Sequence, residues 1–131
     1  MHSTQRIMFG AAGVLGGLGV VAGAFAAHAL RDRLDASELS AFETGAQYQV
    51  YHAIALLALS ALPKSMWANR WLQCAGWLWL AGVVLFSGSL YGLAFTDWRW
   101  LGPVTPLGGL AFILGWVSVI GAAITSPSHD S

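Results

Sequence analysis

The chain has 131 residues, of which 56% are hydrophobic and 9% charged, and its six Lys/Arg residues balance its six Asp/Glu residues. A soluble domain carries roughly 25% charged residues, so this composition excludes an ordinary water-soluble domain and favours a single integral membrane domain over residues 1–131. Because the chain has no net charge to recruit polyanions, we expect no nucleic-acid partner.

The first predicted span is an uncharged run over residues 7–30, preceded by Arg6. A helix of this length crosses a hydrocarbon core of roughly 30 Å at 1.5 Å per residue. A secretory signal peptide is the alternative, because Arg6 precedes the run and residues 24–26, Ala-Phe-Ala, mimic a cleavage site. The length of the run and the presence of further spans favour a retained helix. Small residues share one face, which predicts close packing against another helix: Ala12, Gly16, Gly19, Gly23 and Ala26 or Ala27.

A charged stretch, residues 31–41, follows the first span. Asp35 and Glu38 have capping-box spacing, although with Asp in place of Ser or Thr at the cap. Interspersed apolar residues could seat a short amphipathic helix on the membrane surface. We therefore predict an interfacial segment, followed by a second span over residues 45–62.

The third predicted span covers residues 71–95 and the fourth residues 107–124, and neither contains a charged residue. Four tryptophans flank the third span in two pairs, and a helix between the pairs would rise about 40 Å, the thickness of a bilayer with its headgroups. This spacing predicts two interfacial belts, formed by Trp67 and Trp71 at one end and by Trp98 and Trp100 at the other. Cys74, the single cysteine, lies in an apolar run and permits no internal disulfide.

Four spans place both termini on one side of the membrane. Each side then carries three Lys/Arg residues, so the positive-inside rule barely discriminates between the orientations. We favour cytoplasmic termini.

Hydrogen-bonding side chains crowd the first half of the second span. They fall on two helical arcs, one with Tyr48, Gln49 and His52 and the other with Glu43, Gln47 and Tyr51. A half-helix that is polar on two arcs cannot face lipid over most of its circumference. We therefore expect it to face protein, water or lipid headgroups.

His28 and His52 form a candidate pair. His28 nearly ends the first span, and if residues 35–44 lie on the membrane surface, His52 sits about 10 Å below the start of its helix, close to the same level. One interpretation is a proton-titrating or metal-binding pair. The other, which we favour, is two histidines bonded to backbone or tyrosine. A metal would lack an obvious third ligand, because Glu43 is the only nearby carboxylate, and we predict no metal site.

Ser87 and Tyr91 share a face of the third span and complete the set of candidate ligand-binding residues. Serine and glycine at such spacing mark helix packing more often than a ligand site. No recognised catalytic motif is present. We therefore assign no catalytic residue, and the cofactor, if any, is unknown.

Several segments together resemble a known family. They are residues 23–30, Gly-Ala-Phe-Ala-Ala-His-Ala-Leu; Phe42 to Gly45 with Tyr48, Gln49 and Tyr51 to Ala53; Phe86 to Tyr91; and Thr105 to Gly109. The family is "domain of unknown function 423", or YgdD-like. Ala26 replaces a glycine usual in its motif. The resemblance covers nearly the whole chain and implies a four-helix protein of the bacterial inner membrane. It implies no activity, substrate or cofactor.

These observations predict an all-α integral membrane bundle of four transmembrane helices, with a short interfacial amphipathic segment before the second. The leading functional hypothesis is a non-enzymatic protein that binds a partner, lipid or small ligand at the polar junction of the first two helices. An oligomeric ion or proton conduit is the first alternative, and a lipid-modifying enzyme is the second. The expected surroundings are the lipid bilayer, with a homo-oligomer or another membrane protein as candidate partners.

Overall fold

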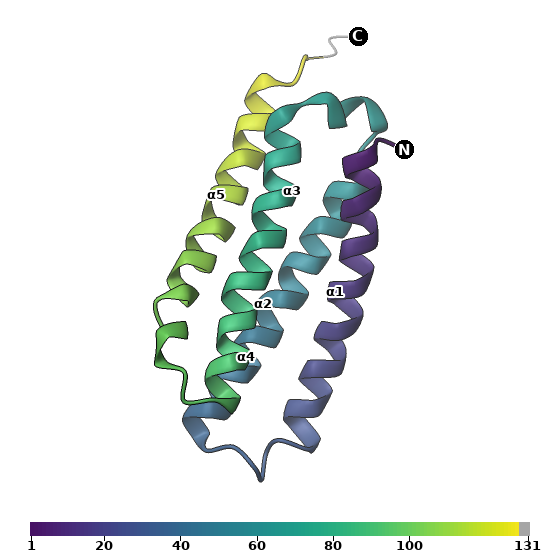
Figure 1. Cartoon of the computed structure of the whole chain (residues 1–131). Helices are drawn as coiled ribbons and strands as arrows, with labels where there is room; N and C mark the ends of the chain where they lie inside the picture. Colours follow the sequence, from purple (N-terminus) through teal and green to yellow (C-terminus); the bar gives the residue numbers. More distant parts are fainter. Residues whose placement is uncertain (129–131) are drawn as a thin grey trace.

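Four long helices run up and down beside one another in the computed structural model, which describes residues 1–128 (Figure 1). Short 3₁₀ turns, η1 and η3, join the second helix to the third and the third to the fourth. The elements are α1 (Ser3–His28), α2 (Ala36–Ser60), η1 (Lys64–Ala68), α3 (Arg70–Gly82), η2 (Val83–Ser87), α4 (Gly88–Phe95), η3 (Arg99–Leu101) and α5 (Val104–Thr125).

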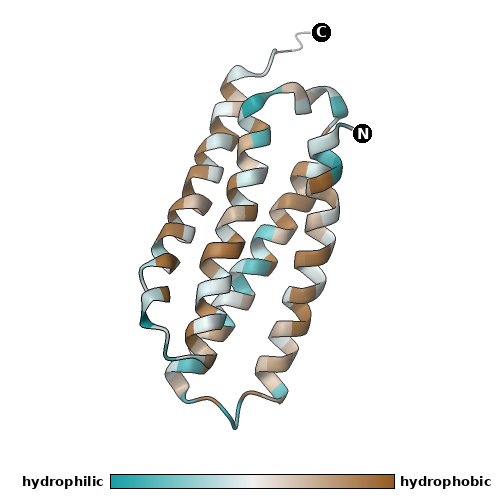
Figure 2. Cartoon of the chain, in the orientation of Figure 1, coloured by the Kyte–Doolittle hydropathy of each residue, from teal (hydrophilic) through white to brown (hydrophobic). Residues whose placement is uncertain are grey.

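Within residues 1–128, three helical stretches are long and apolar enough to cross a membrane: Ser3–His28, Arg70–Phe95 and Arg99–Thr125. α2 has 25 residues, enough to span a bilayer. Its polar side chains, however, make it less apolar than these three stretches. Figure 2 shows hydrophilic residues along the middle of α2, whereas the middle of α1 is pale to apolar. The predicted all-α fold is thus confirmed, with three helices that can span a membrane.

α2 begins earlier than the sequence predicted. Asp35 caps it and forms the expected capping box with Glu38, and the helix then runs without interruption from Ala36 to Ser60. The predicted interfacial segment therefore does not exist as a separate element. Gly45, where the second span was predicted to begin, lies within the helix and is a site of close contact, where an added Cβ would lie 2.9 Å from the Tyr91 ring.

The small-residue face of α1 packs against α2, as predicted. A Cβ on Gly19 would meet the Val50 side chain at 2.6 Å, and one on Gly16 would lie 3.7 Å from the Ala53 Cβ. Gly23 differs, because no heavy atom of a neighbouring element lies within 4 Å of its Cβ position. The backbones of α1 and α2 therefore touch through Gly16 and Gly19 and leave open space at Gly23.

The third long helix contains a π-helical turn, η2, which the sequence did not reveal. α5 lies against this turn through Gly108, where an added Cβ would meet the Phe86 backbone. Gly115 of α5 lies equally close to the indole of Trp79. These glycines allow α5 to approach the third helix more closely than side chains would permit.

The main hydrophobic core lies between the helices and includes Met8, Leu56, Trp67 and Trp79, all at most 2% exposed. Trp67 was predicted to belong to an interfacial belt, but it is fully buried, because η1 folds back over the end of the bundle. Trp71, Trp98 and Trp100 are exposed, as residues of such a belt should be.

Candidate functional site

Gln49 lies on the polar arc of α2 that also carries Tyr48 and His52, and this inward arc faces the bundle. Through its side chain, Gln49 connects α2 to α1 and α4. Its Nε2 donates to the carbonyl oxygen of Leu15 on α1 at 2.9 Å, and its Oε1 accepts from the Tyr91 hydroxyl on α4 at 2.7 Å. Gln49 is 5% exposed. Because both ends of the amide are occupied by the protein, Gln49 and Tyr91 act first as interhelical connectors.

Ser87 makes a second connection between the same helices. Its hydroxyl donates to the carbonyl oxygen of Gly45 at 2.7 Å, and the side chain is 1% exposed. The sequence placed Ser87 and Tyr91 on one face, and in the structure both residues bond to α2. An added Cβ at Gly45 would lie 3.3 Å from the Ser87 carbonyl oxygen and 2.9 Å from the Tyr91 ring, so a larger residue would require these neighbours to shift.

His52 lies in an aromatic environment between α2 and α5. Its Nδ1 is 2.9 Å from the carbonyl oxygen of Tyr48, and its Nε2 accepts from the Trp116 indole at 3.3 Å. A carbonyl can only accept, so the ring hydrogen lies on Nδ1 and the imidazole is neutral. The Phe112 ring stacks on it with centroids 3.7 Å apart. This arrangement matches the interpretation in which His52 is bonded to the backbone.

Tyr48 lies beside His52 but is 39% exposed. Its ring packs against Phe86 and Phe112, with centroids 4.9 and 6.2 Å apart. Its carbonyl, rather than its hydroxyl, is the group that contacts His52.

The structure does not bring His28 to His52. Gly16 lies beside Ala53, and His28 is twelve residues further along α1, a rise of about 18 Å. His28 is exposed at the end of α1, whereas His52 is 5% exposed. The predicted proximity assumed that residues 35–44 lie on the membrane surface, separate from the second span. Because α2 begins at Ala36, His52 lies about 24 Å along the helix, and the two histidines have separate environments.

Gln5 is a buried polar residue that precedes the first span predicted from the sequence, residues 7–30. It is 5% exposed, and its Nε2 donates to the carbonyl oxygens of Ser60 and Leu62 at 3.0 and 2.9 Å. The last carbonyls of a helix lack intrahelical partners, and Gln5 satisfies them at the end of α2. A lone glutamine at the start of a helix gives no sequence signal for such a role.

The second polar arc of α2, with Glu43, Gln47 and Tyr51, is the outward arc and faces a groove between α1 and α2. This groove has a volume of about 280 Å³. Its α2 wall carries Glu43, Gln47 and Tyr51, and its α1 side includes Gly19 and Gly23. Glu43 and Gln47 are exposed and Tyr51 is 53% exposed. In residues 1–128, these three side chains have no hydrogen-bond partner. The outward arc therefore differs from the inward arc, whose polar groups are used within the bundle.

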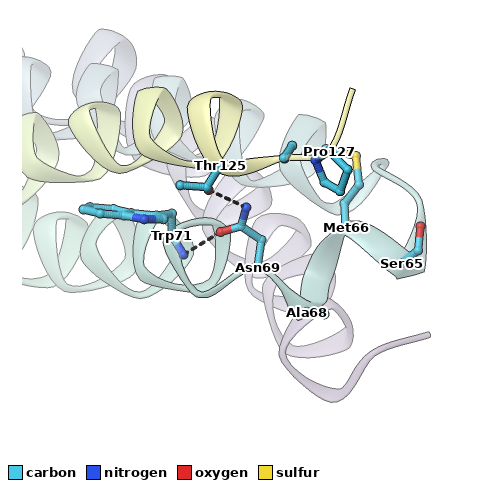
Figure 3. Close-up of a pocket in the computed structure, with 8 residues that line it drawn as sticks. Ser65, Met66, Ala68, Asn69, Trp71, Thr125 and Pro127 are labelled. Atoms are coloured by element: carbon cyan, nitrogen blue, oxygen red, sulfur yellow. Dashed lines mark hydrogen bonds between the residues drawn. The ribbon is translucent and has the colours of Figure 1, made fainter. Parts of the chain in front are cut away.

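A larger cavity, of about 580 Å³, lies at the end of the bundle where η1 meets α3 and the end of α5 (Figure 3). Asn69 lines it, donates to the Thr125 hydroxyl at 2.9 Å and accepts from the backbone amide of Trp71 at 3.0 Å. No charged residue lines this cavity. Asn69 is committed to joining α3 and α5, so its amide is already used within the bundle.

Over the part of the chain that the structure describes, no group of three or more His, Cys, Asp or Glu side chains could hold a metal ion. Of the candidate residues, Gln49, His52 and Ser87 are buried between helices, Tyr91 is partly buried, and His28, Glu43 and Tyr48 are exposed. Their role in binding a ligand stays a prediction.

Comparison with known proteins places these features in a family. Residues 22–109 match the model of a family described as "Protein of unknown function (DUF423)". The chain is 43% identical over 118 residues to the UPF0382 membrane protein YwdK of Bacillus subtilis, covering 90% of this chain and 94% of the relative. It is 38% identical over 121 residues to the UPF0382 inner membrane protein YgdD of Escherichia coli, covering 92% of each. No solved structure matches.

Proposed function

Since the chain belongs to the DUF423 family and is a multi-pass protein of the bacterial inner membrane, we propose that it is a non-enzymatic protein that binds a partner within the bilayer. The binding surface is the groove between α1 and α2. The observation that carries this proposal is the outward arc of α2, where Gln47 and Tyr51 face the groove without partners. Hydrogen-bonding groups exposed to hydrocarbon are costly, so an occupant that bonds to them would be favoured.

The proposal requires α2 to be a fourth transmembrane helix. Contacts along α2 support this: Gln5 meets Ser60 near one end, and Gly19 meets Val50 near the middle. Toward the other end, Phe42 shares a buried cluster with Ala26 of α1. A helix that packs along a spanning helix lies at the same depth in the bilayer. The polar residues of α2 lower its hydropathy, but Gln49 and His52 face protein and so carry little cost in lipid.

Topology provides the first test. In a Cys74→Ser background, cysteines introduced at Ser37 and Ser65 should react with a membrane-impermeant maleimide from opposite sides of the membrane, because α2 separates them. A cysteine at Ser3 should share the side of Ser65. Labelling of positions 37 and 65 from the same side would show that α2 does not cross.

Photo-crosslinking tests the groove itself. A photoreactive phenylalanine derivative at Tyr51, in native membranes, should give a specific adduct that a Gln47→Leu substitution diminishes. The matched control is Val84, which is 65% exposed on the third helix and should give only diffuse lipid labelling. Equal labelling patterns at the two positions would overturn the proposed binding function.

A further inference from the structure

We infer that the occupant of the groove is a second copy of this chain, with Gln47 of α2 facing its own counterpart. This inference rests on the proposed function, because it names the partner of the same groove. Three features of the groove carry it: the depth of its polar groups, their self-complementary chemistry and the open space beside them.

The depth of the polar groups favours a protein over a lipid. Gln47 and Tyr51 lie eleven and fifteen residues from Ala36, or about 16 and 22 Å along a helix about 37 Å long. They are therefore near the middle of α2. A bilayer offers only acyl chains at that depth, so a phospholipid headgroup or ester could reach only Glu43, nearer the end of the helix. An external hydrogen-bonding partner for Gln47 at this depth is therefore another polypeptide and not a lipid.

The chemistry of the polar groups is self-complementary. A glutamine amide both donates and accepts, as does a tyrosine hydroxyl, so each can pair with an identical group. Two copies inserted in the same orientation hold the same residue at the same depth. A two-fold axis along the membrane normal therefore brings Gln47 to Gln47. Interhelical bonds between such side chains stabilise association of membrane helices.

The shape of the groove suits a helix better than a small molecule. Its volume of about 280 Å³ is at the lower limit for ligand pockets, which hold roughly 300–1,000 Å³. Gly23 has no heavy atom of another element within 4 Å of its Cβ position, which leaves space for a side chain from a neighbouring helix. Glu43 lies four residues, or about 6 Å along the helix, from Gln47 toward the start of α2, so its carboxylate is closer to water than the Gln47 amide is.

Disulfide crosslinking tests the inference. The chain has one native cysteine, Cys74, which is exposed and is first replaced by serine. In native membranes under mild oxidation, Gln47→Cys should form a disulfide-linked dimer, whereas Val84→Cys should remain monomeric. Val20→Cys, at the α1 side of the groove, provides a second position if the Gln47 variant does not accumulate.

Self-association of the Cys74→Ser chain, labelled at its amino terminus with a donor or an acceptor dye and measured by fluorescence energy transfer in lipid vesicles, gives an independent readout. Gln47→Leu should weaken association about tenfold, in keeping with the loss of an interhelical hydrogen bond in a membrane, and Val84→Leu should leave it unchanged. Crosslinking no greater at Gln47 and Val20 than at Val84, or a monomer at all protein-to-lipid ratios, would overturn the dimer. If the photoreactive group at Tyr51 then captured a different protein or a lipid, the binding function would survive without the second copy. If it captured nothing specific, both proposals would fall.

Discussion

Replacing Gly108 with alanine is expected to destabilise the bundle by roughly 1–3 kcal/mol, the usual cost of inserting a methyl group into a packed interior. The new Cβ would lie 2.7 Å from the Phe86 Cα and closer still to its backbone nitrogen. Backbone atoms cannot rotate away, so α5 would have to move off η2. Chemical denaturation of the purified protein in detergent micelles measures the change in unfolding free energy.

Gly109 is the matched control, one residue along the same helix. Its Cβ would lie 3.9 Å from the Phe86 ring, an ordinary contact. Gly109→Ala should therefore be neutral, or stabilising by up to about 1 kcal/mol through helix propensity. If both variants were equally stable, the close approach of α5 to η2 would not be the packing that holds these helices together.

Replacing Gln49 with leucine should lower stability by roughly 1–3 kcal/mol, because it removes bonds to two helices and leaves the Tyr91 hydroxyl unpaired. Tyr91→Phe removes one of these bonds and should cost less. The double variant should be more stable than the sum of the two losses predicts, since the two groups share a bond. The unfolding free energies of the unmodified protein, the two single variants and the double variant, measured in the same detergent, complete this double-mutant cycle.

Gln47→Leu is the control for that cycle, two residues away on the outward arc. Its side chain is exposed, so the unfolding free energy of the monomer should not change. This variant should alter self-association instead. Additive losses for Gln49→Leu and Tyr91→Phe, or an equal loss for Gln47→Leu, would contradict the assignment of the inward arc to folding and of the outward arc to binding.

The helices themselves could be predicted from composition and pattern. The capping pair Asp35 and Glu38 indicated where a helix starts, although the sequence predicted a separate segment there and α2 instead runs on without interruption. The small residues Gly16 and Gly19 indicated a packing face, because only a residue without a large side chain lets two helices touch in lipid. The π turn of η2 could not be predicted, since its residues also fit an ordinary helix.

The sequence by itself determined that the chain is helical and membrane-embedded, because long uncharged stretches must satisfy their backbone within helices in a bilayer. It also determined that α2 has two polar arcs, because helical spacing sets the angle between side chains. Only the tertiary structure decided which arc faces inward. Gln49 finds the Leu15 carbonyl and the Tyr91 hydroxyl, whereas Gln47 finds none among the described residues. Helical spacing cannot reveal that difference, because the partners come from helices that are distant in the chain.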